Sequence, residues 1–132
     1  MKTLTPSSTT KAPAEWFTGD VWFDILARAE EPARLRVNTV RFSPCARTAW
    51  HSHSLGQTLH VTEGIGIVAT RDTVIVMRSG GSVWTPPGEE HWHGALPDRF
   101  MSHLAMWEAD DATWGALVTD DEYRAAVAAH DL

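Results

Sequence analysis

Two short histidine clusters constrain this 132-residue chain more than any other feature of its sequence. In the first cluster, His51 and His53 stand one residue apart, and Gln57 follows just after Gly56. Side chains two residues apart on a β-strand point to the same face, so the two imidazoles would lie close enough to share one metal ion. Gln57 has the same parity and would reach that ion if the chain turns at Gly56. Neutral imidazole is the commonest metal ligand in proteins, so the spacing predicts half of a metal site.

In the second cluster, His91 and His93 flank Trp92 and follow the run Pro86-Pro87-Gly88. Pro and Gly turn the chain sharply, so this run would deliver His91 to a defined position. Three imidazoles and one amide would leave the charge of a divalent ion uncompensated and the ion a strong Lewis acid. Such ligands suit Mn²⁺, Fe²⁺, Co²⁺, Ni²⁺ or Zn²⁺ without choosing among them. The predicted metal ligands are His51, His53, Gln57 and His91, and the alternative role of Gln57 is a hydrogen bond to a ligand.

The remaining histidines differ in what their positions predict. His93 shares parity with His91, so it could be a free imidazole beside the ion and act as a general acid or base. The alternatives for His93 are a hydrogen bond to a ligand or a place at the rim of the site. His60 has the opposite parity to Gln57, and His130 lies in the C-terminal region, so neither is expected at the site.

Composition narrows the class of protein. The net charge is −6 and no basic run is present, which argues against nucleic acid as a partner. A single cysteine excludes an internal disulfide framework. No apolar run approaches the roughly 20 residues that a transmembrane helix needs, and the N-terminus lacks the apolar core of a signal peptide. A cytoplasmic protein that acts on a small molecule, away from membranes, is therefore expected.

Alternation of apolar and polar residues predicts an all-β domain. We expect a flexible N-terminal arm over residues 1–13, a barrel over 14–118 and a C-terminal helix over 119–132. Within the barrel, strands are predicted at 35–42 and 100–108, with a strand pair over 16–25 around Gly19-Asp20. Residues 27–34 are predicted as a loop, Glu63-Gly64 as a turn, and 65–70 with 73–77 as a hairpin. The helix follows a capping box formed by Thr119 and Glu122.

The two clusters resemble the two motifs of the cupin family. In the first motif, a Gly is followed after five residues by His-x-His, and a carboxylate and a second Gly come later. Residues 45–64 match this pattern with two departures: Cys45 stands in place of the first Gly, and Gln57 stands in place of the carboxylate. In the second motif, Gly-x5-Pro-x-Gly-x2-His, residues 80–91 match at every fixed position. The resemblance implies a cupin fold (a double-stranded β-helix or jelly-roll barrel). It also implies self-association as a dimer or tetramer.

A narrower resemblance is to the small bacterial manganese cupins with hydroxynitrile lyase activity. It rests on similar residues at 13–19, 47–51, 55–59, 87–95 and 103–105. The resemblance implies bound Mn²⁺ and cleavage of a cyanohydrin such as mandelonitrile into an aldehyde and HCN. It further implies that His103, with His93, is the catalytic base and that Thr48 and Trp107 line the substrate pocket. A polar residue is expected in place of Trp107, and the parity of Thr48 is opposite to that of His51.

Three other functions fit the same residues. A cupin oxygenase would bind O₂ and substrate at the open metal positions and would need a redox-active ion. A non-redox isomerase or cyclase would use the ion to hold an enolate. A non-catalytic domain would only bind a small ligand.

Overall fold

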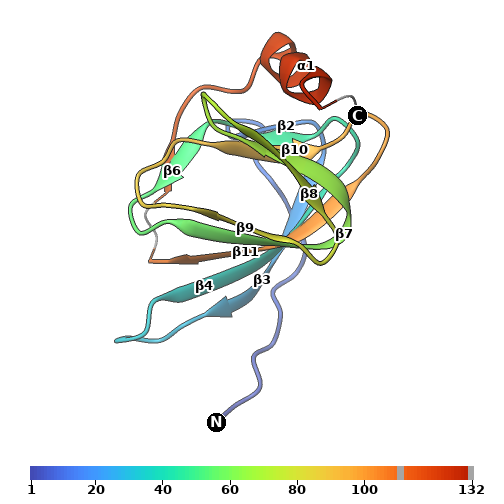
Figure 1. Cartoon of the computed structure of the whole chain (residues 1–132). Helices are drawn as coiled ribbons and strands as arrows, with labels where there is room; N and C mark the ends of the chain where they lie inside the picture. The colour runs from blue at the N-terminus through green and yellow to red at the C-terminus, as the bar shows by residue number, and fades with distance from the viewer. Residues whose placement is uncertain (110–111, 131–132) are drawn as a thin grey trace.

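A curled sheet, with a separate two-stranded sheet beside it, forms most of the described molecule, and a short helix lies on the outside (Figure 1). The computed structural model describes residues 1–109 and 112–130, so parts of the predicted barrel (110–111) and helix (131–132) lie outside the described residues. The fold is the all-β barrel with a C-terminal helix that the sequence predicts. The elements are β1 (Thr10–Lys11), β2 (Phe17–Thr18), β3 (Val21–Arg28), β4 (Leu35–Phe42), β5 (Arg47–Thr48), β6 (His51–His53), β7 (Gln57–Ala69), β8 (Val74–Arg78), β9 (Ser82–Thr85), β10 (Trp92–Ala95), β11 (Met101–Glu108), β12 (Ala112–Trp114) and α1 (Asp120–Ala128).

Strand β7 joins the two halves of the barrel. Its first half pairs with β9 and β11, and its second half pairs with β8 and β10. The predicted turn at Glu63-Gly64 is wrong, because the strand continues through this point with a shift in register opposite β11. Gly64 has a φ of 77°, and a Cβ there would lie 2.1 Å from the carbonyl oxygen of Phe100. The glycine therefore marks a bend with close backbone approach and not the end of a strand.

The N-terminal strands pair differently from the prediction. Residues 16–25 do contain two strands, β2 and β3, but these do not pair with each other. The positive φ of Gly19 turns the chain between them, so β2 pairs with β5 while β3 pairs with β4. Strand β3 also continues to Arg28, two residues into the predicted loop 27–34.

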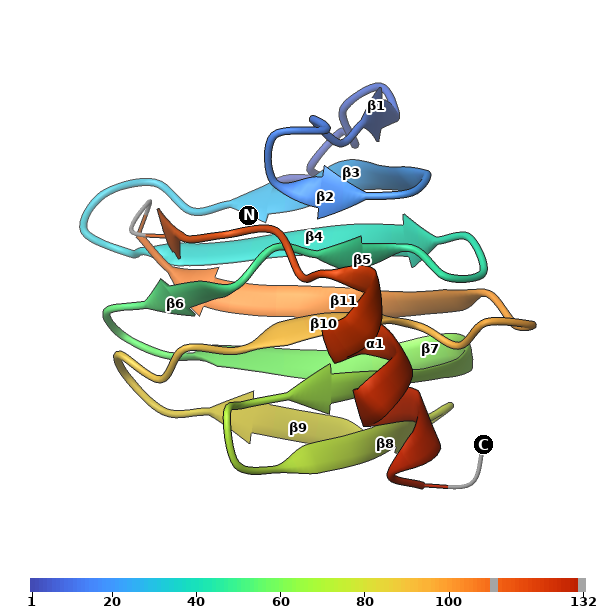
Figure 2. The same ribbon diagram turned by 90° about the horizontal axis from the view of Figure 1, so that it is seen from above.

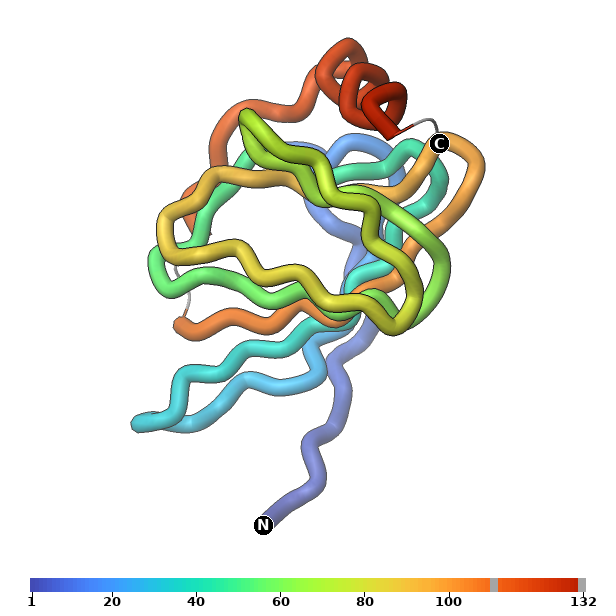
Figure 3. The backbone as a smooth tube through the Cα atoms, in the orientation of Figure 1, coloured from blue at the N-terminus to red at the C-terminus, as the bar shows by residue number. Residues whose placement is uncertain are grey.

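The N-terminal arm is partly attached to the barrel. Thr10 and Lys11 form β1 and pair with Phe23 and Trp22 of β3. The backbone N–H of Ala12 donates to the carbonyl oxygen of Val21 at 2.8 Å. The end of the predicted arm is therefore an edge strand, and the Ser7 side chain accepts the backbone N–H of Ile25 on β3. Figure 3 shows the chain running outward from there to the N-terminus.

Helix α1 begins where the capping box predicts. The Thr119 side chain accepts a hydrogen bond from the backbone N–H of Glu122 at 3.1 Å, and acidic residues fill the first turn. Tyr123, Ala126 and Val127 face an apolar cluster that includes Ile67 and Trp92, so the helix lies across the outside of β7, β8 and β10 (Figure 2). In the described ranges 1–109 and 112–130, no helix is both long and apolar enough to cross a membrane.

The barrel interior is filled with apolar side chains at one end. Phe42, Leu59, Val61 and Met101 are buried there, each at most 1% exposed. The other end carries the histidines and opens into a cavity. The core therefore fixes the strands at one end and leaves the other end for a site.

Candidate metal centre and cavity

The two histidine clusters meet across a pair of backbone hydrogen bonds. His51 lies at the start of β6 and His91 just before β10, and their backbones form an antiparallel bridge with both N–H···O distances at 2.9 Å. Their imidazole centroids lie 4.3 Å apart. The chain segments predicted as two half-sites are therefore neighbours in the fold.

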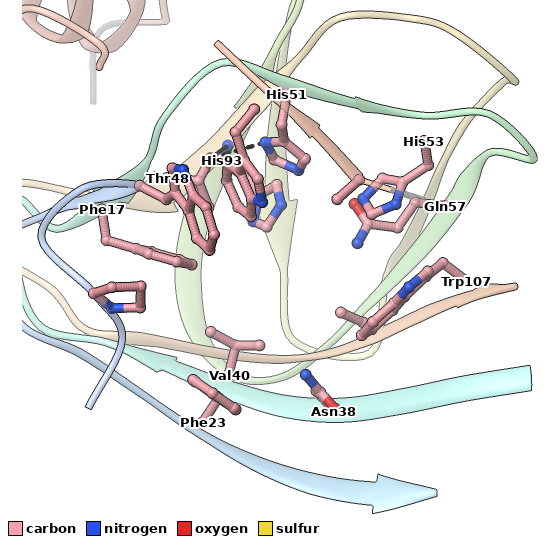
Figure 4. Close-up of a pocket in the computed structure, with 15 residues that line it drawn as sticks. Phe17, Phe23, Asn38, Val40, Thr48, His51, His53, Gln57, His93 and Trp107 are labelled. Atoms are coloured by element: carbon pink, nitrogen blue, oxygen red, sulfur yellow. Dashed lines mark hydrogen bonds between the residues drawn. The ribbon is translucent and has the colours of Figure 1, made fainter. Parts of the chain in front are cut away.

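Three buried histidines form a compact group. One ring nitrogen from each of His51, His91 and His93 lies within 4.8 Å of the corresponding atoms of the other two. The group includes His93, which was predicted as an acid or base, and does not include His53. The His53 ring is also buried, with its centroid 5.4 Å from that of His51 and 6.1 Å from that of His91. The predicted ligands thus gather at one end of the barrel, with His53 farther from the centre of the group (Figure 4).

The hydrogen bonds of the ligands fix which ring nitrogen is available. His51 Nδ1 donates to the carbonyl oxygen of Ala49, and His91 Nδ1 donates to that of Glu89, both at 2.9 Å. Each Nε2 then carries a lone pair, which is the arrangement expected of metal-binding histidines.

Gln57 completes this side of the site. Its Oε1 lies 3.1 Å from His91 Nε2. Because both atoms are acceptors in this tautomer, a cation near both would satisfy them together. The buried donor set therefore fits a divalent metal ion.

Burial keeps these imidazoles neutral. Loss of hydration lowers the pKa of His51 and of His93 well below the usual histidine value, and the neighbouring histidines lower both further. Burial also lowers the pKa of His91. The neutral ring is the form that binds metal or accepts a proton, so the site favours both roles near neutral pH.

His93 and His103 form a buried pair. His103 Nε2 lies 2.9 Å from His93 Nδ1, and His103 is fully buried, which lowers its pKa to about 4. His93 lines the cavity, whereas His103 is not among the lining residues. In the part of the chain that the structure describes, His93 Nε2 has no hydrogen-bond partner. Of the two predicted catalytic residues, His93 therefore reaches the cavity directly and His103 lies behind it.

The cavity has a volume of about 480 Å³ and mostly apolar walls. Trp16 and Trp114 stack on one wall with ring centroids 5.1 Å apart, and Trp114 also lies 4.7 Å from the His51 ring. The cavity residues are Pro13, Trp16, Phe17, Phe23, Asn38, Val40, Thr48, His51, His53, Gln57, His93, Ala105, Trp107, Ala112 and Trp114.

Both predicted pocket residues lie in this cavity. The Thr48 hydroxyl donates to the carbonyl oxygen of Ala49 and accepts the backbone N–H of His93. The parity of Thr48 relative to His51 does not apply, because β5 ends at Thr48 and β6 begins at His51, so the two residues do not share one strand. Trp107 faces His53, with ring centroids 5.9 Å apart.

Sequence reasoning missed most of the aromatic wall. Trp16, Phe17 and Trp114 come from short strands or loops that carry no clear alternation. Asn38 had a usable signal, because it shares parity with Val40 and Phe42, which point into the barrel.

The residues expected to take no part lie elsewhere. His60 Nδ1 lies 2.7 Å from the Ser82 hydroxyl, and His130 Nε2 donates to the carbonyl oxygen of Val74. Cys45 is exposed in a turn, where it has a φ of 69°.

Comparison with known proteins agrees with this geometry. Residues 38–104 match the family described as the cupin domain. A protein named (R)-mandelonitrile lyase from Granulicella tundricola is 48% identical over 118 residues, which cover 86% of this chain and 90% of that protein. A solved cupin-like protein from Thermotoga maritima is 36% identical with a TM-score of 0.84, covering 96% of this chain and 97% of its own. A polyketide cyclase from Streptomyces resistomycificus shares the fold at 18% identity, with a TM-score of 0.72 over 94% of this chain and 91% of its own. The chain therefore belongs to the cupin family.

Proposed function

We propose that this cupin is a metal-dependent lyase that cleaves or forms cyanohydrins such as mandelonitrile. The proposal depends most on the surroundings of the His93 Nε2 atom. It has no hydrogen-bond partner among the described residues, belongs to a residue that lines an aromatic cavity, and lies beside two predicted metal ligands. The 48% identity to a named (R)-mandelonitrile lyase supports the choice of reaction.

In this proposal, His51, His53, Gln57 and His91 hold a divalent ion. Manganese is the ion that the resemblance to the manganese cupin lyases implies. When bound, the ion would supply Lewis acidity to the hydroxyl group of the substrate. Thr48 supports the site indirectly, because its hydroxyl accepts the His93 backbone N–H and so fixes the start of β10.

The proton transfer falls to His93. Its Nε2 takes the hydroxyl proton while the bond between the carbinol carbon and the nitrile carbon breaks and its electron pair leaves with cyanide. The proton then passes from His93 to cyanide, so that the products are an aldehyde and HCN. In the tautomer that leaves the lone pair on His93 Nε2, His93 Nδ1 donates to His103 Nε2, so His103 orients the His93 ring and shares the positive charge that His93 gains.

The cavity suits an aromatic substrate. The phenyl ring of mandelonitrile would lie among the rings of Phe17, Trp107 and Trp114. Aromatic rings gain from offset or edge contacts beyond simple burial, so these walls would orient the substrate.

Cleavage of mandelonitrile by the purified protein tests the proposal. We expect release of benzaldehyde and cyanide above the uncatalysed rate, loss of that release with a chelator, and recovery with added Mn²⁺. Absence of release from manganese-loaded protein would contradict the lyase. Oxygen uptake by the iron-loaded protein would then favour the oxygenase.

Metal content tests the ligand set separately from activity. His53→Ala is expected to lose bound metal, and His93→Ala is expected to keep it. The reverse result would assign the ion to the compact group of His51, His91 and His93. We also propose that the protein is cytoplasmic, for which its single cysteine is the support.

A further inference from the structure

One polar side chain on the cavity wall takes no part in the proposed chemistry. Asn38 lies on β4, across the cavity from His51 and His93 (Figure 4). Around it the wall is apolar, with Phe23, Val40 and Trp107 as its labelled neighbours in the figure. Asn38 therefore sets the polarity of the end of the cavity away from the histidines.

The strand register explains why the Asn38 side chain faces open space. Its Cα is paired with Ala105 of β11 and with Ile25 of β3. Ala105 also lines the cavity, and its methyl group fills little of the volume beside Asn38. A larger residue at position 105 would occupy the space that the Asn38 amide now faces.

The other polar residues of the wall already have contacts within the protein. The Thr48 hydroxyl makes two hydrogen bonds, and Gln57 Oε1 contacts His91. By contrast, no residue in 1–109 or 112–130 forms a hydrogen bond with the Asn38 side chain. A half-buried amide without a protein partner costs free energy unless water or a ligand forms a hydrogen bond with it. Ligand pockets use such polar groups to orient the ligand.

The charge of the wall limits what Asn38 can bind. Among the described residues that line the cavity, none is Lys, Arg, Asp or Glu. At the Asn38 end of the cavity, away from the proposed metal ion, a carboxylate or ammonium group on the substrate would therefore lose its hydration without finding an opposite charge. The amide offers one acceptor and two donor hydrogens, which match a neutral hydroxyl group.

We propose that Asn38 is a specificity-determining residue that hydrogen-bonds a hydroxyl group on the aromatic ring of the substrate. This inference rests on the proposed lyase function and names its substrate class as ring-hydroxylated aromatic cyanohydrins and the corresponding aldehydes. The reacting carbon lies at the histidines, the ring lies between the aromatic walls, and the ring hydroxyl reaches Asn38.

Paired substrates test the proposal. The cyanohydrins of 3- and 4-hydroxybenzaldehyde are each compared with those of the corresponding methylbenzaldehydes, because a methyl group has the size of a hydroxyl but forms no hydrogen bond. We expect kcat/KM to favour one hydroxyl compound over its methyl partner by about fivefold, as one neutral hydrogen bond allows.

Two variants locate the effect. Asn38→Leu keeps a side chain of similar size and should remove the preference for the hydroxyl compound over its methyl partner. Thr39→Val is the matched control, because Thr39 lies on the opposite face of the same strand and does not line the cavity. It should keep the preference. A preference that survives in Asn38→Leu would overturn the proposal.

Binding without turnover separates this inference from the lyase. The probes are hydroxybenzyl and methylbenzyl alcohols, and the signal is quenching of the tryptophans that line the cavity. Tighter binding of a hydroxybenzyl alcohol by the wild type, lost in Asn38→Leu, supports the subsite even if no cyanohydrin is cleaved. Cleavage of cyanohydrins with equal binding of both alcohols would overturn the subsite and leave the lyase. If Asn38→Leu fails to fold, the comparison of the two alcohols on the wild-type protein tests the proposal by itself. Equal binding of the hydroxybenzyl and methylbenzyl alcohols would then overturn it.

Discussion

At the scale of single residues, His93 and His103 have different access to the cavity. His93 lines the cavity, and its Nε2 has no hydrogen-bond partner in 1–109 or 112–130, whereas His103 is buried behind it and contacts His93 Nδ1. We expect His93→Ala to lower kcat by about 10²- to 10⁴-fold, the range of a lost general base, and His103→Ala to lower it less. Steady-state kinetics with metal analysis measures both. An equal loss in the two variants, with metal retained, would return the role of the base to His103.

Cys45 stores backbone strain in the exposed turn just before β5. Its φ of 69° lies in the left-handed region, where a side chain costs about 1–2 kcal/mol, and the first cupin motif has Gly at this position. Part of the gain from Cys45→Gly is offset by the larger chain entropy of Gly in the unfolded state. The net stabilisation should be about 1 kcal/mol, or roughly 3 to 5 °C in Tm by calorimetry. Cys45→Ser keeps the Cβ and should leave Tm unchanged, and a similar rise in both variants would contradict the strain.

Local spacing predicted which residues would lie close together in the fold. His51 and His91 were identified because they lie in short motifs with fixed offsets, and the structure brings them together. Thr48 was assigned to the cavity against its parity, and it does line the cavity because the strand is interrupted after it. Trp114 could not be identified, because its place beside His51 depends on pairing between β12 and β6.

At the scale of elements, alternation identified strands but not their partners. Residues 35–42 were predicted with the bounds that β4 has. The pair expected over 16–25 was wrong because each strand finds its partner elsewhere in the chain, which alternation alone does not encode. The turn expected at Glu63-Gly64 was wrong because a glycine at a bend within a strand has the same local sequence signal as a turn.

Helix α1 is attached to the barrel by an apolar face, by hydrogen bonds from Arg47 and Trp50 to acidic residues of its first turn, and by one buried hydrogen bond from Tyr123. The Tyr123 hydroxyl donates to the carbonyl oxygen of Ala95 at 2.6 Å, and Tyr123 is 4% exposed. Tyr123→Phe leaves that carbonyl without this partner and should lower the free energy of unfolding by about 1 kcal/mol.

Chemical denaturation measures the change, with Arg124→Ala as the control. Arg124 lies on the same helix, but its ion pair with Asp121 is exposed, so its removal should have little effect. Bound metal should not change in either variant, because α1 packs outside the barrel and does not line the cavity. A larger loss from Arg124→Ala than from Tyr123→Phe would contradict this account of how the helix is attached.

At the scale of the whole molecule, the outer surface near the open end of the barrel carries a groove of mixed polar and apolar lining. Leu35, Leu55 and Trp84 line it and are 48%, 44% and 65% exposed. Contiguous exposed apolar surface marks sites of association, and the resemblance to cupins implies a dimer or tetramer.

We therefore expect this groove to be buried between copies of the chain, with Trp84 near the centre of the contact. Trp84→Glu would place a charge there and should lower the mass measured by light scattering at micromolar protein, with circular dichroism unchanged. Ile75→Glu is the matched control. Ile75 is apolar and as exposed as Leu55, but it lies on β8, outside the groove. A monomeric wild type would contradict self-association itself. If Trp84→Glu leaves the oligomer intact and Ile75→Glu disrupts it, the interface lies instead on the part of the sheet that carries β8.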